Sequence, residues 1–509
     1  MQVPENESTT QRSLTERTLS GFAWMFSGSM AGAGLQLVVT MILARLLSPA
    51  DFGLLSAALV IIYFSEIFSS LGMGPALVQR KELEPRHINT GFTTNLVLTA
   101  LLTTLVFFTA PAISTFYRIP ELTYVLQVLA FVFPIRGFGV LSEALLKRTS
   151  RFRQLATIDF LSYVVGYTFI GIPLAWAGYG VWALVGATLS QAFLRTLLLF
   201  VYRPTSLRLR FNWLAFKELI GFGGGFTTTV LVNYLARQGD NFVVGRWLGP
   251  EALGFYGKAF SLMTLPTKEF SKIVDDVLFP ALAQVQDDRS KLASAYQRGI
   301  GTISIVVLPA SVFAIILAPE LIQLVYGPQW GQAIRPFQIL CLSMFFRSAY
   351  KMSDTVIKAC GAVYRHTLVQ VIYATCVIGG AIWAQKWGLV GVAATSASAI
   401  LIHYVLLGRV SLNLTGLSWR AFLSWHKPAL LLSVVETFVL LTIVLFMRYF
   451  DVSSFFVLLG GAAGMCASLL LLLRFFPAVF GEAGEWVWRW MVHLLRRRYD
   501  RKLIVKGES

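Results

Sequence analysis

The sequence predicts an all-α, polytopic membrane protein with about fourteen transmembrane helices, in two six-helix lobes and two extra C-terminal helices. Composition, the spacing of apolar segments and an internal repeat support this fold. Of the 509 residues, 56% are hydrophobic and only 14% are charged, whereas a soluble chain carries about 25% charged residues. The mean hydropathy is +0.66. These values exclude a cytosolic enzyme, a disordered chain and a secreted disulfide scaffold.

Apolar segments long enough to cross a bilayer, which takes roughly 20 residues, recur along the chain. The N-lobe spans are expected near residues 19–46, 52–73, 88–110, 122–146, 157–177 and 180–202. The C-lobe spans are expected near 218–247, 251–279, 299–325, 333–357, 366–385 and 388–408, with two more near 428–447 and 453–474. Short connections leave no room for an extramembrane domain, so function takes place within the membrane.

Basic residues in the connections alternate in number along this map. The even-numbered connections and the N-terminal tail hold more than three times as many as the odd-numbered connections. By the positive-inside rule the richer side is cytoplasmic, and so are both termini. The net charge of +17 then reflects contact with anionic membrane lipids, and no nucleic acid partner is expected.

These features divide the chain into six parts. They are a cytoplasmic tail (1–17), the N-lobe (18–202), a cytoplasmic linker (203–217), the C-lobe (218–410), two further spans (411–475) and a basic cytoplasmic tail with an interfacial helix (476–509).

An internal repeat relates the two lobes. At an offset of 201 residues the first hairpins of the two lobes share several residues, among them the pairs Arg45 and Arg246, Pro49 and Pro250, and Gly53 and Gly254. A six-span unit returns the chain to the same side, so the repeats are parallel, and in transporters such repeats enclose the substrate site. We assign a hinge or gating role to these matched residues.

The first-hairpin stretch LSPADFGL, the stretch DNFVVGRWLGPEALGFYGKA from Asp240 to Ala259 and the 6+6+2 plan form a combined signature. With it the chain resembles the polysaccharide-transporter branch of the multidrug/oligosaccharidyl-lipid/polysaccharide exporter superfamily. The matching residues are Pro49, Gly53, Asp240, Pro250, Gly254 and Tyr256. The resemblance implies a Wzx-type flippase in the bacterial cytoplasmic (inner) membrane. Its substrate would be a polyprenyl-pyrophosphate-linked oligosaccharide, with a polysaccharide polymerase and a chain-length regulator as further partners.

Basic residues inside the predicted spans indicate a cationic cavity. A charge at the bilayer centre costs at least about 2.5–3.5 kcal/mol, so these residues should face one another or water. Arginine and lysine suit a pyrophosphate because they donate to phosphate oxygens. The candidates for substrate binding are Arg136, Arg237, Lys258, Arg347 and Lys351. Structural ion pairs between helices are the alternative for each of them.

Three in-span carboxylates are candidates for ion coupling, with H+ or Na+ as the coupling ion: Asp240, Glu66 and Asp354. Asp240 could instead pair with Arg237, three residues away. Neither a P-loop nor a Cys or His metal-binding pattern is present in the sequence, so no cofactor or metal is expected.

Other functions remain as alternatives. A membrane glycosyltransferase or polymerase would need catalytic carboxylates on a sizeable outer loop, and the outer connections are short. A cation-coupled multidrug antiporter would favour an acidic cavity. A lipid II or teichuronic-type flippase would be expected to have the same positively charged cavity as the leading interpretation.

Overall fold

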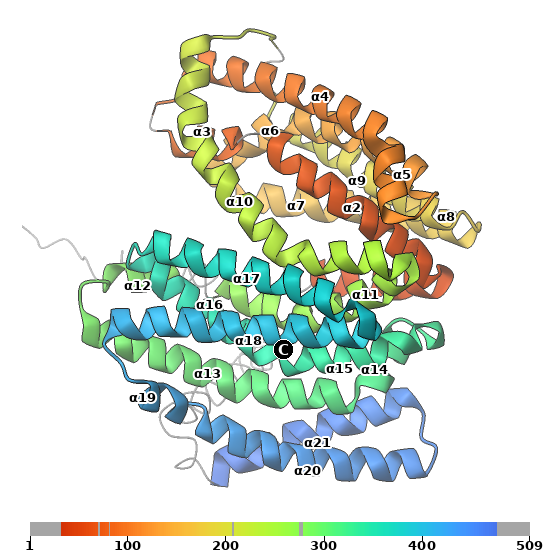
Figure 1. Cartoon of the computed structure of the whole chain (residues 1–509), viewed down its shortest axis with the longest axis vertical. Coiled ribbons are helices and arrows are strands. Elements are labelled where there is room, and N and C mark those ends of the chain that lie inside the picture. The colour runs from red at the N-terminus through yellow and green to blue at the C-terminus, as the bar shows by residue number, and fades with distance from the viewer. Residues whose placement is uncertain (1–31, 70–71, 81, 206–207, 274–277, 476–509) are drawn as a thin grey trace, which may run out of the picture. The chain divides into compact units, whose positions relative to one another are not determined.

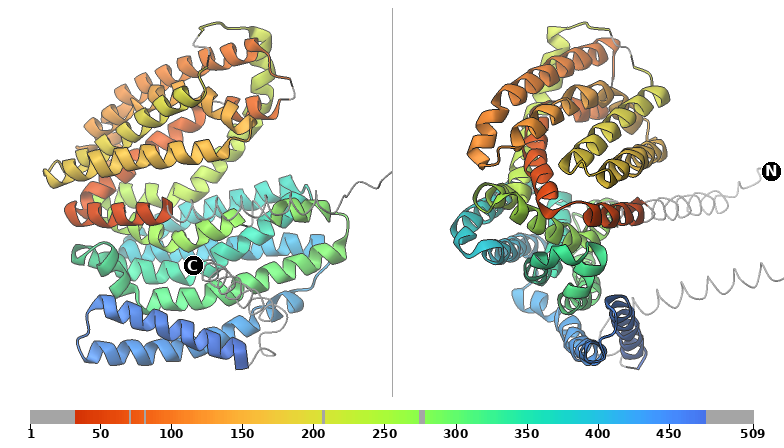
Figure 2. Two further views of the ribbon diagram at one scale, coloured as in Figure 1. Left: turned by 180° about the vertical axis from the view of Figure 1, so that it is seen from behind. Right: turned by 90° about the vertical axis from the view of Figure 1, so that its right-hand side faces the viewer.

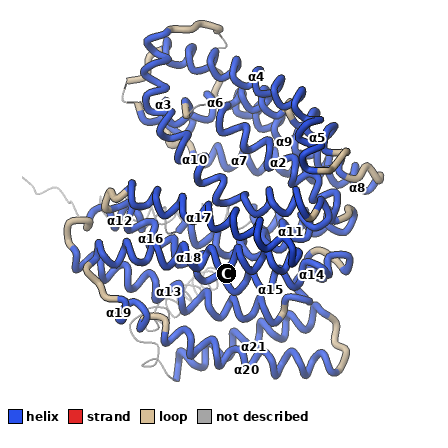
Figure 3. The backbone as a smooth tube through the Cα atoms, viewed as in Figure 1, coloured by secondary structure: helices blue, strands red, loops and turns tan. Residues whose placement is uncertain are grey.

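The computed structural model describes residues 32–69, 72–80, 82–205, 208–273 and 278–475. Within these residues every regular element is a helix (Figure 3), so the all-α prediction is confirmed. The predicted N-terminal tail (1–17), the start of the first span and the basic tail with its interfacial helix (476–509) lie outside the described residues.

The chain forms two compact units, Met1–Leu231 and Val232–Ser509. The boundary falls inside one long helix, α10 (Trp213–Trp247), whose first part belongs to the first unit and whose last part belongs to the second. The six-part division expected from the sequence stays a prediction.

The first unit begins with an apolar helix, Gly32–Leu46. Its other helices are α2 (Pro49–Ser69), α3 (Met73–Gln79), α4 (Pro85–Tyr117), α5 (Leu122–Leu129), α6 (Val132–Arg148), α7 (Phe152–Tyr163), η1 (Val164–Gly171), α8 (Ile172–Trp176) and α9 (Val181–Tyr202). Buried Leu77, Leu141 and Leu219 form part of a core between α3, α4, α6 and the start of α10. Arg148 donates to backbone carbonyls at the end of α3, among them those of Leu77 and Val78.

Two predicted spans of this unit are interrupted helices. The span expected at 122–146 consists of α5 and α6, and the span expected at 157–177 consists of α7, the π-helical segment η1 and α8. A Cβ atom on Gly166 of η1 would lie 2.8 Å from the carbonyl oxygen of Ala187 in α9. Glycine is therefore required there for the close approach of the two backbones.

The second unit continues from α10 through a series of helices, of which the α-helices are labelled in Figure 1. They are α11 (Gly249–Ile273), α12 (Phe279–Gln284), α13 (Arg289–Ile316), α14 (Ala318–Val325), η3 (Pro328–Ala333), α15 (Ile334–Leu342), α16 (Met344–Ala359), α17 (Val363–Ala384), η4 (Gln385–Trp387), α18 (Gly388–Thr415), α19 (Trp419–Ser424), α20 (Lys427–Tyr449) and α21 (Ser454–Phe475). Helix α18 packs against α15, α16 and α17. Helices α20 and α21 form a hairpin and lie side by side in both views of Figure 2.

Many of these helices can cross a bilayer. In the described part of the chain, nine helical stretches have the length and composition of a membrane span, and one of them, Tyr364–Thr415, contains both α17 and α18. The span expected at 333–357 is divided at Ser343 into α15 and α16. The chain is thus a multi-pass membrane protein, and the total of fourteen spans is not confirmed.

Candidate functional site

Asp240 lies at the meeting point of three helices in the second unit. Its buried carboxylate accepts a 2.6 Å hydrogen bond from the Tyr256 hydroxyl of α11 and a 3.3 Å bond from Ser396 of α18. The backbone N–H of Asn241 donates to the other carboxylate oxygen at 2.8 Å. Three donors from three directions hold the carboxylate in one orientation, as a buried polar group requires.

The suggestion that Asp240 pairs with Arg237 is wrong. Among the described residues, no ion pair joins these two side chains. Arg237 is exposed, whereas Asp240 is only 3% exposed. The two residues are three apart on α10, which allows a shared face. However, the partners of Asp240 lie on α11 and α18, and the carboxylate turns toward them.

Arg347 of α16 lies among aromatic rings beside Asp240. Its guanidinium carbon is 4.9 Å from the centre of the Phe260 ring, a cation–π geometry. It also reaches the Tyr373 hydroxyl of α17, and the Asp240 carboxylate is close enough to attract it. An arginine held by one ring face and one hydroxyl keeps donors for an incoming anion.

A second charged group on α16 surrounds the buried carboxylate of Asp354. Lys358 Nζ lies 2.9 Å and Lys351 Nζ 3.6 Å from its Oδ2 atom. The His366 Nε2 atom of α17 lies 2.7 Å from its Oδ1 atom. The expected one-sided arrangement of charges on this helix is present. Asp354 holds the two lysines along the face that also carries Arg347.

Lys258 does not share the surroundings of Arg347. Its Nζ atom lies 5.7 Å from the centre of the Tyr326 ring, and its carbonyl oxygen accepts a bond from the Tyr326 hydroxyl. Tyr326 follows α14, whereas Tyr256, two residues before Lys258, faces Asp240. The two side chains therefore leave α11 in different directions.

The first unit places two of the expected site residues in one ion pair. Arg136 of α6 donates to both carboxylate oxygens of Glu66 in α2, at 3.1 and 2.8 Å, and lies over the Tyr63 ring. Both side chains are about one-third exposed or less. This pair satisfies the expectation that in-span charges face one another, and it joins a substrate-binding candidate to an ion-coupling candidate.

The repeat residues lie at equivalent places in the two units. Pro49 begins α2, and Pro250 follows Gly249 at the start of α11. Gly53 and Gly254 are buried in the first turns of these helices. Arg45 and Arg246 lie at the ends of the preceding helices. Their hinge or gating role stays a prediction.

Four residues of the second unit belong to the site although the charge pattern alone did not select them as site residues: Tyr256, Tyr373, Ser396 and His403. Tyr256 was noted only through the family resemblance. Ser396 and His403 are seven residues apart on α18, a spacing that places both on one helix face. That polar spacing in an apolar helix was the available signal.

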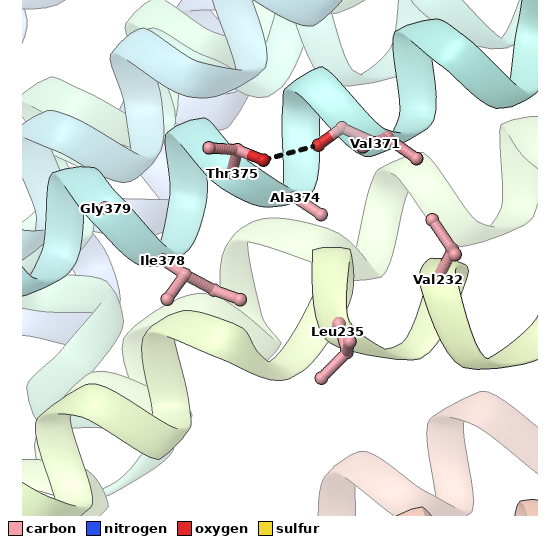
Figure 4. Close-up of a pocket in the computed structure, with 7 residues that line it drawn as sticks. All are labelled: Val232, Leu235, Val371, Ala374, Thr375, Ile378 and Gly379. Carbon is pink, nitrogen blue, oxygen red and sulfur yellow. Dashed lines mark hydrogen bonds between the residues drawn. The ribbon is translucent and has the colours of Figure 1, made fainter.

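A groove lies between α10 and α17. Its lining residues on α10, Val232 and Leu235, come shortly before Asp240 in the sequence. Its volume is about 430 Å³, and Figure 4 shows the seven residues that line it: Val232, Leu235, Val371, Ala374, Thr375, Ile378 and Gly379. The Thr375 hydroxyl donates to the Val371 carbonyl within its own helix (Figure 4). The groove therefore presents an almost entirely apolar surface.

Three similarities to known proteins bear on this arrangement. The chain is 28% identical to the lipopolysaccharide biosynthesis protein WzxC of Escherichia coli (strain K12), over 66% of this chain and 68% of that protein. It is 25% identical to the teichuronic acid biosynthesis protein TuaB of Bacillus subtilis (strain 168), over 91% and 97%. Its fold matches the inward closed lipid II flippase MurJ with a TM-score of 0.74, at 17% identity, over 89% and 99% of the two chains.

The helical fold, with charged groups inside its spans, defines a multi-pass membrane protein with the fold of that flippase. Residues 42–335 match the family described as polysaccharide biosynthesis protein, and the chain belongs to that family. The resemblance stated from the sequence is thereby confirmed.

Proposed function

We propose that this chain moves polyprenyl-pyrophosphate-linked oligosaccharides from the cytoplasmic to the outer leaflet of the bacterial cytoplasmic (inner) membrane, by alternating access. Membership of the polysaccharide biosynthesis family supports this function. Both termini are proposed to lie in the cytoplasm. A polymerase and a chain-length regulator are the proposed users of the product, and H+ or Na+ the proposed coupling ion.

The arrangement around Arg347 carries the proposal. A planar guanidinium matches two phosphate oxygens, and the hydrophobic surroundings strengthen its attraction for an anion. Lys351 lies one helical turn further along α16 and adds a second positive charge. Two cations one turn apart suit the two phosphates of a pyrophosphate linkage.

The lipid part of the substrate also needs a surface. The apolar groove between α10 and α17 has no charged lining residue and suits a hydrocarbon chain. Its lining residues Leu235 and Val371 are near Arg237 and Tyr373 in the sequence, respectively. The groove is the proposed place for part of the polyprenyl chain.

Substrate charge supplies a driving force. A pyrophosphate diester that moves outward passes toward the positive side of a membrane that is negative inside. The potential contributes about 2.3 kcal/mol per charge per 100 mV. The return of the empty carrier is then the step at which an ion coupled to Asp240, Asp354 or Glu66 would act.

Reconstituted vesicles provide the test. Flipping of a fluorescent polyprenyl-pyrophosphate oligosaccharide should fall by about tenfold to hundredfold in Arg347→Ala, which removes charged hydrogen bonds. Arg347→Lys should keep part of the rate because the charge remains. Arg420→Ala, an exposed arginine before α20, is the matched control and should flip normally. Normal flipping by an Arg347→Ala, Lys351→Ala double variant would show that the two cations are structural.

A teichuronic-type or lipid II flippase is the alternative. The match to TuaB covers 97% of that protein, which favours testing such lipids in the same vesicles. A higher flipping rate for lipid II or a teichuronic precursor than for the O-antigen or capsule precursor would favour the alternative.

A further inference from the structure

His403 is a buried histidine for which the described structure offers no hydrogen-bond partner. It lies on α18 and is only 2% exposed. Both ring nitrogens, Nδ1 and Nε2, are without a hydrogen bond. A neutral imidazole has one N–H donor and one acceptor nitrogen. Burying it inside a protein without either hydrogen bond costs free energy. The side chain is therefore held by something other than hydrogen bonds.

Two tyrosine rings hold it. Tyr373 of α17 stacks on His403 with ring centres 4.2 Å apart and an angle of 12°, and the Tyr350 ring of α16 lies at 4.7 Å. Tyr373 also reaches Arg347, the cation of the proposed pyrophosphate site. The histidine thus lies directly behind the ring that contacts this cation.

Charged groups act on His403 from two neighbouring helices. Arg347, Lys351 and Asp354 of α16 and His366 of α17 are close enough to influence it electrostatically. Further titratable groups are Tyr256 of α11, which reaches Ser396 one heptad earlier on α18, and Tyr296 of α13, which influences the adjacent Tyr404. Asp354 is already shared by Lys358, Lys351 and His366. Burial opposes a positive charge on His403 most strongly, and the two cations Arg347 and Lys351 add to this effect.

We propose that His403 is a proton-binding site linked to anion occupancy at Arg347 and Lys351. When a pyrophosphate diester neutralises the two cations, a proton from water adds to the free lone pair of the imidazole. When the anion leaves, the same proton returns to water. The inference rests on the proposed function and adds a proton that binds together with the substrate, separate from the ion proposed to act on the return of the empty carrier.

The sign of the linkage follows from charge. An imidazolium and a bound anion attract each other, so each favours the binding of the other, and the effect is reciprocal. Lower pH should therefore tighten substrate binding. An imidazole in water changes its charge near physiological pH, and in the empty site burial and the two cations keep His403 neutral.

His426 shows what a structural histidine looks like in the same unit. Its Nε2 atom lies 2.7 Å from the Tyr404 hydroxyl, and its Nδ1 atom lies 2.8 Å from the Phe422 carbonyl oxygen. Both nitrogens have fixed partners, so a proton has no free position. This histidine provides a matched control on the neighbouring segment.

The experiment measures proton uptake by calorimetry on the full chain in nanodiscs, in buffers of different ionisation enthalpy. The probe is a farnesyl-pyrophosphate-linked N-acetylglucosamine. It is a diphosphate diester, so it lacks the phosphate monoester group that would itself titrate near pH 6. The wild type should take up as much as about one proton per ligand, and its affinity should rise by up to about tenfold per pH unit between about pH 8 and pH 5.

His403→Phe keeps an aromatic ring for stacking and removes the proton site. It should bind the probe without proton uptake and with an affinity that does not change with pH, whereas His426→Phe should keep the uptake. Retained uptake in His403→Phe, or equal loss in both variants, would overturn the assignment. If His403→Phe does not fold, the wild type still decides, because binding without proton uptake also overturns the proposal.

The two proposals can fail separately. Wild-type vesicles that flip the lipid-linked oligosaccharide while binding the probe without proton uptake would leave the transport function intact and remove the proton site. Wild-type protein that neither binds the probe nor flips the lipid would contradict the transport function itself.

Discussion

Asp240 carries the first prediction at the scale of single residues. Asp240→Asn keeps an oxygen that accepts the Tyr256 hydrogen bond but cannot bind a proton. If Asp240 is a coupling group, the pH dependence of transport in vesicles should flatten. An unchanged pH profile would remove Asp240 from that role. Arg237→Gln is the control. Because Arg237 is exposed and makes no ion pair with the carboxylate among the described residues, adding this change should not rescue Asp240→Asn.

A second residue-scale prediction concerns Glu66 and Arg136. Replacing both with Gln should cost less stability than the sum of the single changes, because each single variant leaves one charge without its partner. The expected coupling energy is about 0.5–1 kcal/mol, since both side chains are partly exposed and solvent screens the pair. Thermal unfolding of the four proteins in detergent measures it. Strictly additive losses would mean that the pair does not form.

The sequence identified which in-span residues are charged, but it identified few of their partners. Asp240 is three residues from Arg237, and its actual partners, Tyr256 and Ser396, are 16 and 156 residues away. Spacing along one helix describes only neighbours on that helix. Contacts between helices depend on how each helix is rotated about its own axis. The sequence pattern of an apolar span with several small residues does not determine that rotation.

Helix packing carries a prediction at the scale of elements. Gly166→Ala should destabilise the first unit by about 1–3 kcal/mol, because the added methyl group would meet the backbone of α9 at Ala187 and Gln191. Gly221→Ala in α10 is the control. A Cβ atom there meets no neighbour within 4 Å, so the helix propensity of alanine should leave stability equal or higher. Equal melting temperatures for the two variants would contradict the packing.

The start of α13 provides a pH-dependent prediction. Asp288 caps this helix by accepting from the backbone N–H groups of Lys291 and Ser290. The bond from Lys291 holds the pKa of the Asp288 carboxyl below its usual value. Its stabilising effect is thus present above the pKa of the unfolded chain and is lost as the pH falls through the lower, folded value.

Asp288→Ala should therefore lower the melting temperature at neutral pH and make little difference in acid. Asp288→Asn keeps an acceptor at the cap and should lose less. Melting curves at several pH values decide this, and a constant difference between wild type and Asp288→Ala would contradict the role of the carboxylate.

The sequence also predicted where the helices lie better than it predicted the breaks within them. Hydropathy predicted one span at 333–357 and one at 157–177, but the chain breaks the first at Ser343 and forms the π-helical segment η1 in the second. Such changes alter backbone hydrogen bonds without altering composition. A window average over about 20 residues therefore passes over them.

The prediction for the whole molecule concerns its membrane topology. Reporter fusions at His87, Arg151, Arg208, Arg289 and Arg365 should report the cytoplasm, and fusions near Arg118, Gly178 and Gly331 the outside. Two neighbouring fusion sites that report the same side would show that a span was miscounted. The fold class followed from composition and the basic residues. The number of crossings depends on such data because the interrupted helices make counting ambiguous.

The position of α10 has a consequence for cutting the chain. Glu218 near the start of α10 pairs with Arg80 at 2.5 Å and with His87 at 2.8 Å, and Leu219 is buried in the core of the first unit. In the sequence, the connection 203–212 comes after Arg80 and His87 and before Glu218 and Leu219. A transporter expressed as two polypeptides divided there should reassemble, because the segment that recognises the N-terminal piece travels with the C-terminal one.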